Sequence, residues 1–117
     1  MDRPGDAVVA AVMSALAGVR VGDAVCGVGT SPRMDAALLA ASRTEALVGA
    51  DARVVVAGAA HDVPVALTRL APGGRLVALA ADSAAAHRVA AAAGLQIRHV
   101  ERLGAVVAWS AVRPLAT

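Results

Sequence analysis

The chain has 117 residues, of which 58% are hydrophobic and 1% aromatic, and its formal net charge is +2. A domain of this length can bury roughly two thirds of its unfolded surface without a disulfide or a metal, so we expect one domain over residues 1–117. The scarcity of aromatic residues and the interleaving of arginines with acids argue against a nucleic-acid partner. The sole cysteine, Cys26, cannot form an internal disulfide and fits a reducing cytoplasm, where we expect the protein to reside.

The apolar N-terminal segment predicts a helix rather than a signal peptide or a membrane span. Asp2 and Asp6 place negative charge where a signal peptide carries positive charge, and no uncharged run reaches the ~20 residues that a membrane span requires. Asp6 can instead cap a helix over Ala7–Ala17, which Gly18 ends. The apolar residues of this helix follow one stripe, as in a helix that packs against a sheet.

A strand, a glycine-containing loop and a helix are predicted next. The strand covers Ala24–Val28, and Ser31 can cap a helix over Pro32–Ser42 because proline is favoured at the first helical position. A loop of this kind presents backbone N–H groups to a nucleotide, which makes Gly27, Gly29 and Ser31 the candidate cofactor-binding residues. A tight turn without a ligand is the alternative interpretation of the same pattern.

The remainder of the chain predicts three more strands and two more helices. Pro72 cannot extend a helix, and Gly73 and Gly74 can turn tightly at positive φ, so a helix ends here and a buried strand follows. The predicted ranges are a strand at Ala52–Ala57, a helix at Val63–Leu70 capped by Asp62, a strand at Arg75–Ala81, a helix at Ala84–Ala93 capped by Ser83, and an antiparallel hairpin of Leu95–Glu101 and Ala105–Val112.

Two stretches resemble class I S-adenosylmethionine (SAM)-dependent methyltransferases. Residues 70–77 read Leu-Ala-Pro-Gly-Gly-Arg-Leu-Val, which resembles the family's passage from its fourth helix into its fifth strand. The loop after the first predicted strand resembles the family's first motif, Gly-Asp-x-Val-Leu-Asp-x-Gly-x-Gly. Matching residues are Gly22, Asp23, Val25 and Gly29, whereas Cys26 stands at the motif leucine, Gly27 at its acid and Ser31 at its second glycine. In the family that acid helps to organise the methionine end of the cofactor, so the resemblance implies a degenerate motif.

The resemblance implies an α/β, Rossmann-like fold with a large deletion. A full methyltransferase has seven strands, and two strand–helix units separate its first and fourth strands, but residues 32–51 suffice only for one helix and a loop. The missing second strand normally ends in an acid that binds the cofactor's ribose hydroxyls. We therefore expect about five strands in the order first, second, third, fifth, fourth. The sheet should be mostly parallel, with a C-terminal antiparallel hairpin and helices unevenly distributed over both faces.

Few polar residues are candidates for chemistry. His61 and Asp62 follow the second predicted strand, where a histidine could act as a general base, but a helix cap beside an exposed histidine explains the same residues. His87 and His99 have no acid or cysteine at ligand spacing, so we predict no metal site. Trp109, on the last predicted strand, should fill a core or an interface.

The handedness of strand connections predicts association. Right-handed crossovers would place the helix at Pro32–Ser42 on the same face as those at Val63–Leu70 and Ala84–Ala93, leaving the opposite face under-covered. The first strand would also form a bare edge. We therefore expect a homodimer or a complex with a larger methyltransferase-like partner.

Three functional hypotheses follow. The first is a degenerate, non-catalytic accessory subunit that binds SAM weakly. The second is a small methyltransferase whose SAM site a partner chain completes, and the third is a Rossmann-like domain that binds another nucleotide at residues 27–32.

Overall fold

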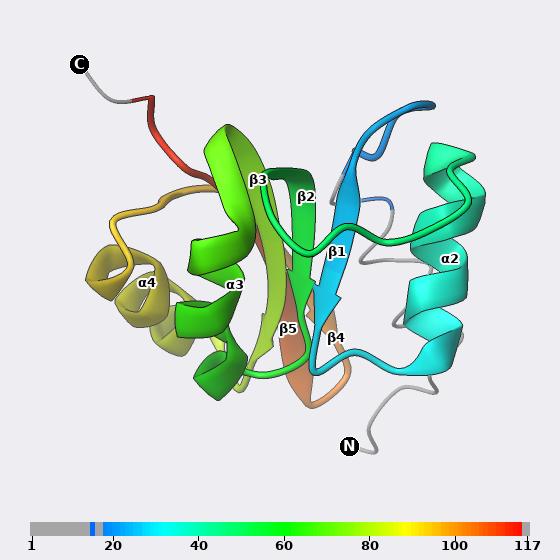
Figure 1. Ribbon diagram of the computed structural model, residues 1–117. Helices are drawn as coiled ribbons and strands as arrows, with labels where there is room; N and C mark the ends of the chain where they lie inside the picture. The colour runs from blue at the N-terminus through cyan, green and yellow to red at the C-terminus, as the bar shows by residue number, and fades with distance from the viewer. Residues whose placement is uncertain (1–14, 16–17, 116–117) are drawn as a thin grey trace.

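The computed structural model describes residue 15 and residues 18–115, so most of the predicted helix at Ala7–Ala17 lies outside the described residues. Strands and helices alternate along the described chain as far as β4, which β5 follows directly (Figure 1). In chain order they are β1 (Val25–Val28), α2 (Pro32–Ser42), β2 (Ala52–Ala57), the short 3-10 turn η1 (Ala60–Asp62), α3 (Val63–Arg69), β3 (Leu70–Ala80), α4 (Ser83–Ala92), β4 (Gln96–Leu103) and β5 (Val106–Val112).

The strands form one five-stranded sheet in the order β1-β2-β3-β5-β4, which confirms the predicted order. Strands β1, β2 and β3 are parallel, with Val25 opposite Val54, whereas β5 lies antiparallel between β3 and β4, with Trp109 opposite Ala78. The predicted α/β class and C-terminal antiparallel hairpin are likewise confirmed. The parallel strands bring the loops that follow β1 and β2 to one edge of the sheet.

Helices cover both faces of the sheet, but their distribution differs from the prediction. Helices α3 and α4 pack on the face that holds the fully buried Trp109, and they lie to the left of the sheet in Figure 1, whereas α2 lies to its right. Met34 and Leu38 of α2 pack on the opposite face, against Val25 and Val54. The prediction that all three helices share one face is therefore wrong, and so is the under-covered face inferred from it. Helix α3 contacts both β1 and β2, so it covers the part of that face on which α2 would have to pack.

The two crossovers consequently have opposite hands. The steps from β1 to β2 and from β2 to β3 run in the same direction across the sheet, yet their helices lie on opposite faces. One crossover is therefore left-handed, an arrangement found in only about 2% of such connections. The outer edge of β1 is also less bare than predicted, because Val48 donates its backbone N–H to the Val25 carbonyl oxygen at 2.9 Å.

Strand β3 begins earlier than predicted, at Leu70 rather than Arg75. Leu70 lies opposite Ala52 and Arg75 lies opposite Val54, so the Pro-Gly-Gly segment between them bulges out of the ladder. Gly73 has a φ of 77° and donates its N–H to the Arg113 carbonyl oxygen at 3.0 Å. The predicted positive φ in this turn is thus confirmed, and the bulge is tied to the end of the chain.

The cap of α4 corrects another prediction. The Asp82 carboxylate accepts the N–H of Ala85 at 2.7 Å, and Asp82 has extended backbone angles, whereas Ser83 is already the first helical residue. An N-cap residue must itself be non-helical, and Asp82, which directly precedes Ser83, meets this condition whereas Ser83 does not. The helix therefore begins one residue earlier than the serine cap implied.

Candidate functional site

The site predicted from the glycine loop lies where β1 ends and α2 begins. Ser31 caps α2 as predicted, accepting the N–H of Met34 on its hydroxyl oxygen at 3.1 Å. Pro32 is the first helical residue, since it lacks the N–H that would be unsatisfied there. The loop is therefore held by local hydrogen bonds that its own sequence supplies.

The space beside Gly27 is filled by side chains from the start of α2. A β-carbon on Gly27 would overlap the Thr30 hydroxyl and would stand 2.6 Å from Oδ1 of Asp35. The Thr30 hydroxyl donates to the same Asp35 oxygen at 2.5 Å. A carboxylate from the first turn of α2 thus lies beside the glycine that stands at the motif acid.

Asp35 is a site residue that the sequence analysis missed. An acid in the first turn of a capped helix directly after a glycine loop was the available signal. That position also suits the positive end of a helix dipole, so the sequence alone does not distinguish the two roles.

The loops after β1 and β2 are in direct contact. A β-carbon on Gly58 would overlap the Gly29 carbonyl oxygen, and the Gly58 N–H donates to the Val28 carbonyl oxygen at 2.9 Å. Gly29 itself has a φ of 66°, and a β-carbon there would overlap the Asp62 carboxylate. Glycine is therefore required at position 58 because the Gly29 backbone approaches so closely, and it is favoured at position 29 by the positive φ and the adjacent Asp62 carboxylate.

His61 and Asp62 lie at this same edge, although not as a helix cap and its neighbour. Asp62 precedes α3 but makes no side-chain capping hydrogen bond, so the predicted cap is wrong. Its carboxylate lies against Gly29 instead, and its Oδ1 is 3.5 Å from His61 Nε2. The His61 side chain is 85% exposed, whereas that of Asp62 is 17% exposed. A general-base role for His61 stays a prediction, and the carboxylate beside it could orient the imidazole.

The acids between α2 and β2 lie away from these loops. Asp51 directly precedes β2, and Glu45 follows the end of α2, where the Gly22 N–H donates to the Ser42 carbonyl oxygen at 2.7 Å. Both acids are thus at the amino ends of the parallel strands, opposite the loops that hold Gly27 and Gly29. Neither is placed to act as the ribose-binding acid of the family.

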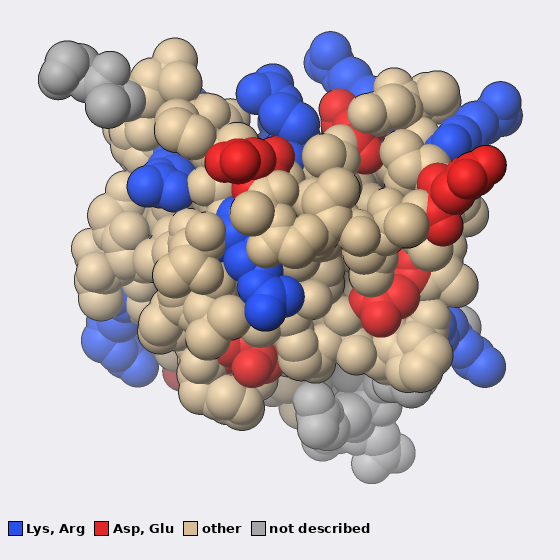
Figure 2. Space-filling view, in the orientation of Figure 1, with Lys and Arg blue, Asp and Glu red and all other residues tan. Residues whose placement is uncertain are grey.

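The described residues contain neither a cluster of metal ligands nor a membrane-spanning helix. Among residue 15 and residues 18–115, no cluster of three or more histidine, cysteine, aspartate or glutamate residues could hold a metal ion. The described helices include none that is long and apolar enough to cross a membrane. Figure 2 shows arginines and acids scattered over this face of the molecule rather than gathered by sign.

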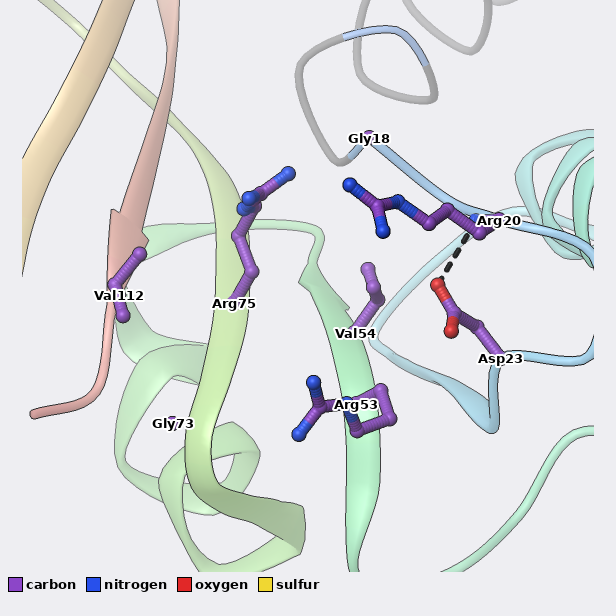
Figure 3. Close-up of a pocket in the computed structure, with 8 residues that line it drawn as sticks. All are labelled: Gly18, Arg20, Asp23, Arg53, Val54, Gly73, Arg75 and Val112. Carbon is purple, nitrogen blue, oxygen red and sulfur yellow. Dashed lines mark hydrogen bonds between the residues drawn. The ribbon is translucent and has the colours of Figure 1, made fainter. Parts of the chain in front are cut away.

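A pocket of about 400 Å³ lies at the other end of the sheet, where the parallel strands begin (Figure 3). Its lining residues are Gly18, Arg20, Asp23, Arg53, Val54, Gly73, Arg75 and Val112. None of the predicted cofactor-binding or catalytic residues belongs to it. The pocket and the glycine loop are therefore separate features of the molecule.

Comparison with protein-family models gives no match. No curated protein sequence matches the chain. Solved structures do resemble it. A SAM-dependent O-methyltransferase from Thermotoga maritima has a TM-score of 0.68 at 11% identity, covering 100% of this chain and 69% of its own.

Two further structures are similar. The 1,6-didemethyltoxoflavin-N1-methyltransferase of Burkholderia thailandensis, solved with its substrate and S-adenosylhomocysteine, has a TM-score of 0.71 at 13% identity and covers 97% of this chain and 80% of its own. A chain from a Haloferax volcanii complex that contains a methyltransferase activator has a TM-score of 0.63 at 14% identity, and the match covers 92% of this chain and 89% of the other. At such identities the likeness concerns the fold. The protein thus has the fold of the class I SAM-dependent methyltransferases over its full length.

Proposed function

We propose that this chain is a methyltransferase-like accessory subunit that binds SAM weakly on its own and acts by association. The proposal rests on the contact between the loops after β1 and β2, where the Gly29 carbonyl oxygen fills the side-chain space of Gly58. A ligand at the carboxyl ends of parallel strands occupies the crevice between the loops that follow them. Backbone contact between these loops narrows that crevice between β1 and β2, which supports weak binding.

The two acids that the family uses to hold the cofactor are also absent from their usual positions at this edge. Gly27 has no side chain, and Glu45 and Asp51 lie at the opposite ends of the strands. Each charge-assisted hydrogen bond that is missing forfeits about 1.5–3 kcal/mol, so the loss of two weakens binding by roughly two to four orders of magnitude. A chain that binds the cofactor so weakly is better suited to an accessory role in a complex than to catalysis on its own.

The proposed partner is a second copy of this chain or a larger methyltransferase-like protein. Large apolar side chains are exposed at Val21 (69%), Val65 (45%) and Leu115 (69%), in three separate segments of the chain, and each could take part in a contact with a partner. A structural relative from Haloferax volcanii comes from a complex with a methyltransferase activator, so association occurs among proteins of this fold.

A small methyltransferase whose site is completed by a partner is the second candidate. Asp35 favours it, because its carboxylate lies beside Gly27, close to where the motif acid would project. In this alternative Asp35 would take over the acid's role from a different backbone position. The two candidates differ in whether Asp35 contacts the cofactor.

Isothermal titration of the full chain with SAM and S-adenosylhomocysteine separates the two candidates. We expect no micromolar binding, whereas a micromolar dissociation constant would overturn the accessory-subunit proposal. If such binding occurs, Asp35→Asn should abolish it in the enzyme alternative. Glu45→Gln, which removes an exposed acid at the far end of the sheet, is the matched control.

Light scattering at micromolar concentration tests self-association. A dimer supports the version with a second copy of the chain. A monomer excludes that version and leaves the larger partner as the form of the proposal to be tested by co-purification with a tagged chain.

A further inference from the structure

We infer that the pocket at the amino ends of the parallel strands binds a small phosphorylated molecule through Arg20 and Arg53, together with Arg75. The three arginines come from separate segments: the loop before β1, the start of β2 and the middle of β3. The parallel strands bring these segments to one edge, on the opposite side of the sheet from the glycine loop. The inference is therefore independent of the proposed function.

The charge of the pocket favours an anion. Among the described residues that line it, Arg20 and Arg53 bring two positive charges against the one carboxylate of Asp23, and Arg75 lies beside them. In Figure 3 the guanidinium groups of Arg20 and Arg75 point toward each other, and that of Arg53 lies below them, over the interval between β2 and β3. Converging like charges repel, and an anion between them relieves that repulsion.

No carboxylate of the described residues neutralises Arg20 or Arg53. The ion pairs within 4.0 Å in the described chain are His61–Asp62 and His99–Glu101, both outside this pocket. Asp23 lines the pocket, but its Oδ2 accepts the backbone N–H of Arg20 at 2.8 Å, and its own N–H donates to the Arg20 carbonyl oxygen at 3.0 Å. Its carboxylate is thus used to close the turn before β1.

Two walls of the pocket are in contact with neighbouring parts of the chain. A β-carbon on Gly18, which has a φ of 60°, would overlap the guanidinium of Arg75, so this side chain lies against the chain at that wall. Gly73 belongs to the bulge that is tied to Arg113. Two walls are therefore preformed.

The chemistry of the lining selects the ligand class. Guanidinium groups donate in a planar fork that matches the oxygens of a phosphate group, and they remain charged at all physiological pH values. A pocket of about 400 Å³ is larger than one phosphate ion and lies within the range of small-molecule sites. Val54 and Val112 supply an apolar wall beside the arginines, which suits the organic part of a phosphorylated small molecule.

The test is an NMR titration of the full chain with inorganic phosphate at constant ionic strength, with a nucleoside monophosphate and its unphosphorylated nucleoside as further probes. We expect saturable shifts of the amide signals of Arg20, Asp23, Arg53 and Gly73 with both phosphorylated probes. The nucleoside should produce none of these shifts. Tighter binding of the monophosphate than of phosphate would indicate that the organic part also contacts the pocket, whereas equal affinity would restrict the site to the phosphate group.

Variants locate the binding. Arg53→Gln should weaken phosphate binding by at least about fivefold, because it removes a charge-assisted donor. Arg88→Gln removes the same charge from the exposed face of α4 and should change the affinity by less than about twofold. Asp23→Asn should tighten binding by about two- to fivefold, since it raises the positive charge of the pocket and keeps an acceptor for the Arg20 N–H.

Arg20 and Arg53 are exposed, so their glutamine variants should fold, and the near-ultraviolet circular dichroism of the buried Trp109 checks this. Shifts that do not saturate, or an Arg88→Gln variant weakened as much as Arg53→Gln, would show that phosphate is attracted only by the overall charge. Either result would overturn the inference.

Discussion

The Asp35 carboxylate occupies the side-chain space of Gly27: its Oδ1 stands 2.6 Å from the point that a β-carbon on this glycine would take. The Thr30 hydroxyl overlaps the same point and donates to that oxygen at 2.5 Å. The residue at the position of the motif acid is therefore kept small by its neighbours. An aspartate at position 27, as in the motif, would therefore compete for space with the Asp35 carboxylate.

Restoring the motif acid should consequently destabilise the protein. We expect Gly27→Asp to lower the free energy of unfolding by about 1–3 kcal/mol, since overpacking of a filled site has costs of this size. The fluorescence of Trp109 during urea unfolding measures it. The double variant Gly27→Asp/Asp35→Ala should regain much of the loss, and a Gly27→Asp protein as stable as the original would contradict the placement of Asp35.

The Pro-Gly-Gly bulge provides a second prediction. Gly73 has a φ of 77°, which a β-branched residue adopts only with strain, so Gly73→Val should cost about 1–3 kcal/mol of stability. Gly49→Val is the matched control, because nothing lies within 4 Å of a β-carbon built there. Equal melting temperatures of the two variants would mean that the bulge conformation is wrong.

The cap of α4 can be tested with two adjacent alanine substitutions. Asp82→Ala removes the acceptor of the Ala85 N–H and should lower stability by about 0.5–2 kcal/mol. Ser83→Ala replaces a first-turn residue whose hydroxyl contributes no cap, and it should change the melting temperature little. A larger effect at Ser83 than at Asp82 would restore the serine cap that the sequence suggested.

The last prediction concerns the end of the chain. The Arg113 guanidinium donates to the carbonyl oxygens of Leu67 at 3.3 Å and Leu70 at 2.7 Å, where α3 ends and β3 begins. Arg113→Ala should lower the free energy of unfolding by about 1.5–3 kcal/mol, as expected for hydrogen bonds from a charged donor. Arg102→Ala, at an exposed position of β4, should leave it nearly unchanged. Similar losses of unfolding free energy in the two variants would show that the hydrogen bonds of Arg113 contribute no particular stability.

The sequence was sufficient for the strand order, because the apolar runs and the Pro-Gly-Gly segment mark their elements locally. It was insufficient for the face that α2 covers, since the outcome depends on α3, which takes the space over β1 and β2. The filled position at Gly27 depends on Asp35, and the partner of Gly29 is Asp62 across the sheet edge. Such contacts between loops leave no periodic pattern in the sequence. The Ser31 cap could be predicted, because its hydroxyl oxygen and the Met34 N–H are only three residues apart.

The position of β5 has a consequence for synthesis. This strand follows β4 in the sequence, yet it lies between β3 and β4, and Arg113 just beyond it donates to the carbonyl oxygens of Leu67 and Leu70. Until β5 has been synthesised, β3 has one open edge, and the carbonyl oxygens of Leu67 and Leu70 lack the Arg113 donor. The sheet can therefore be completed only after β5 has left the ribosome, and a chain that stops before β5 would expose the edge of β3 to other molecules.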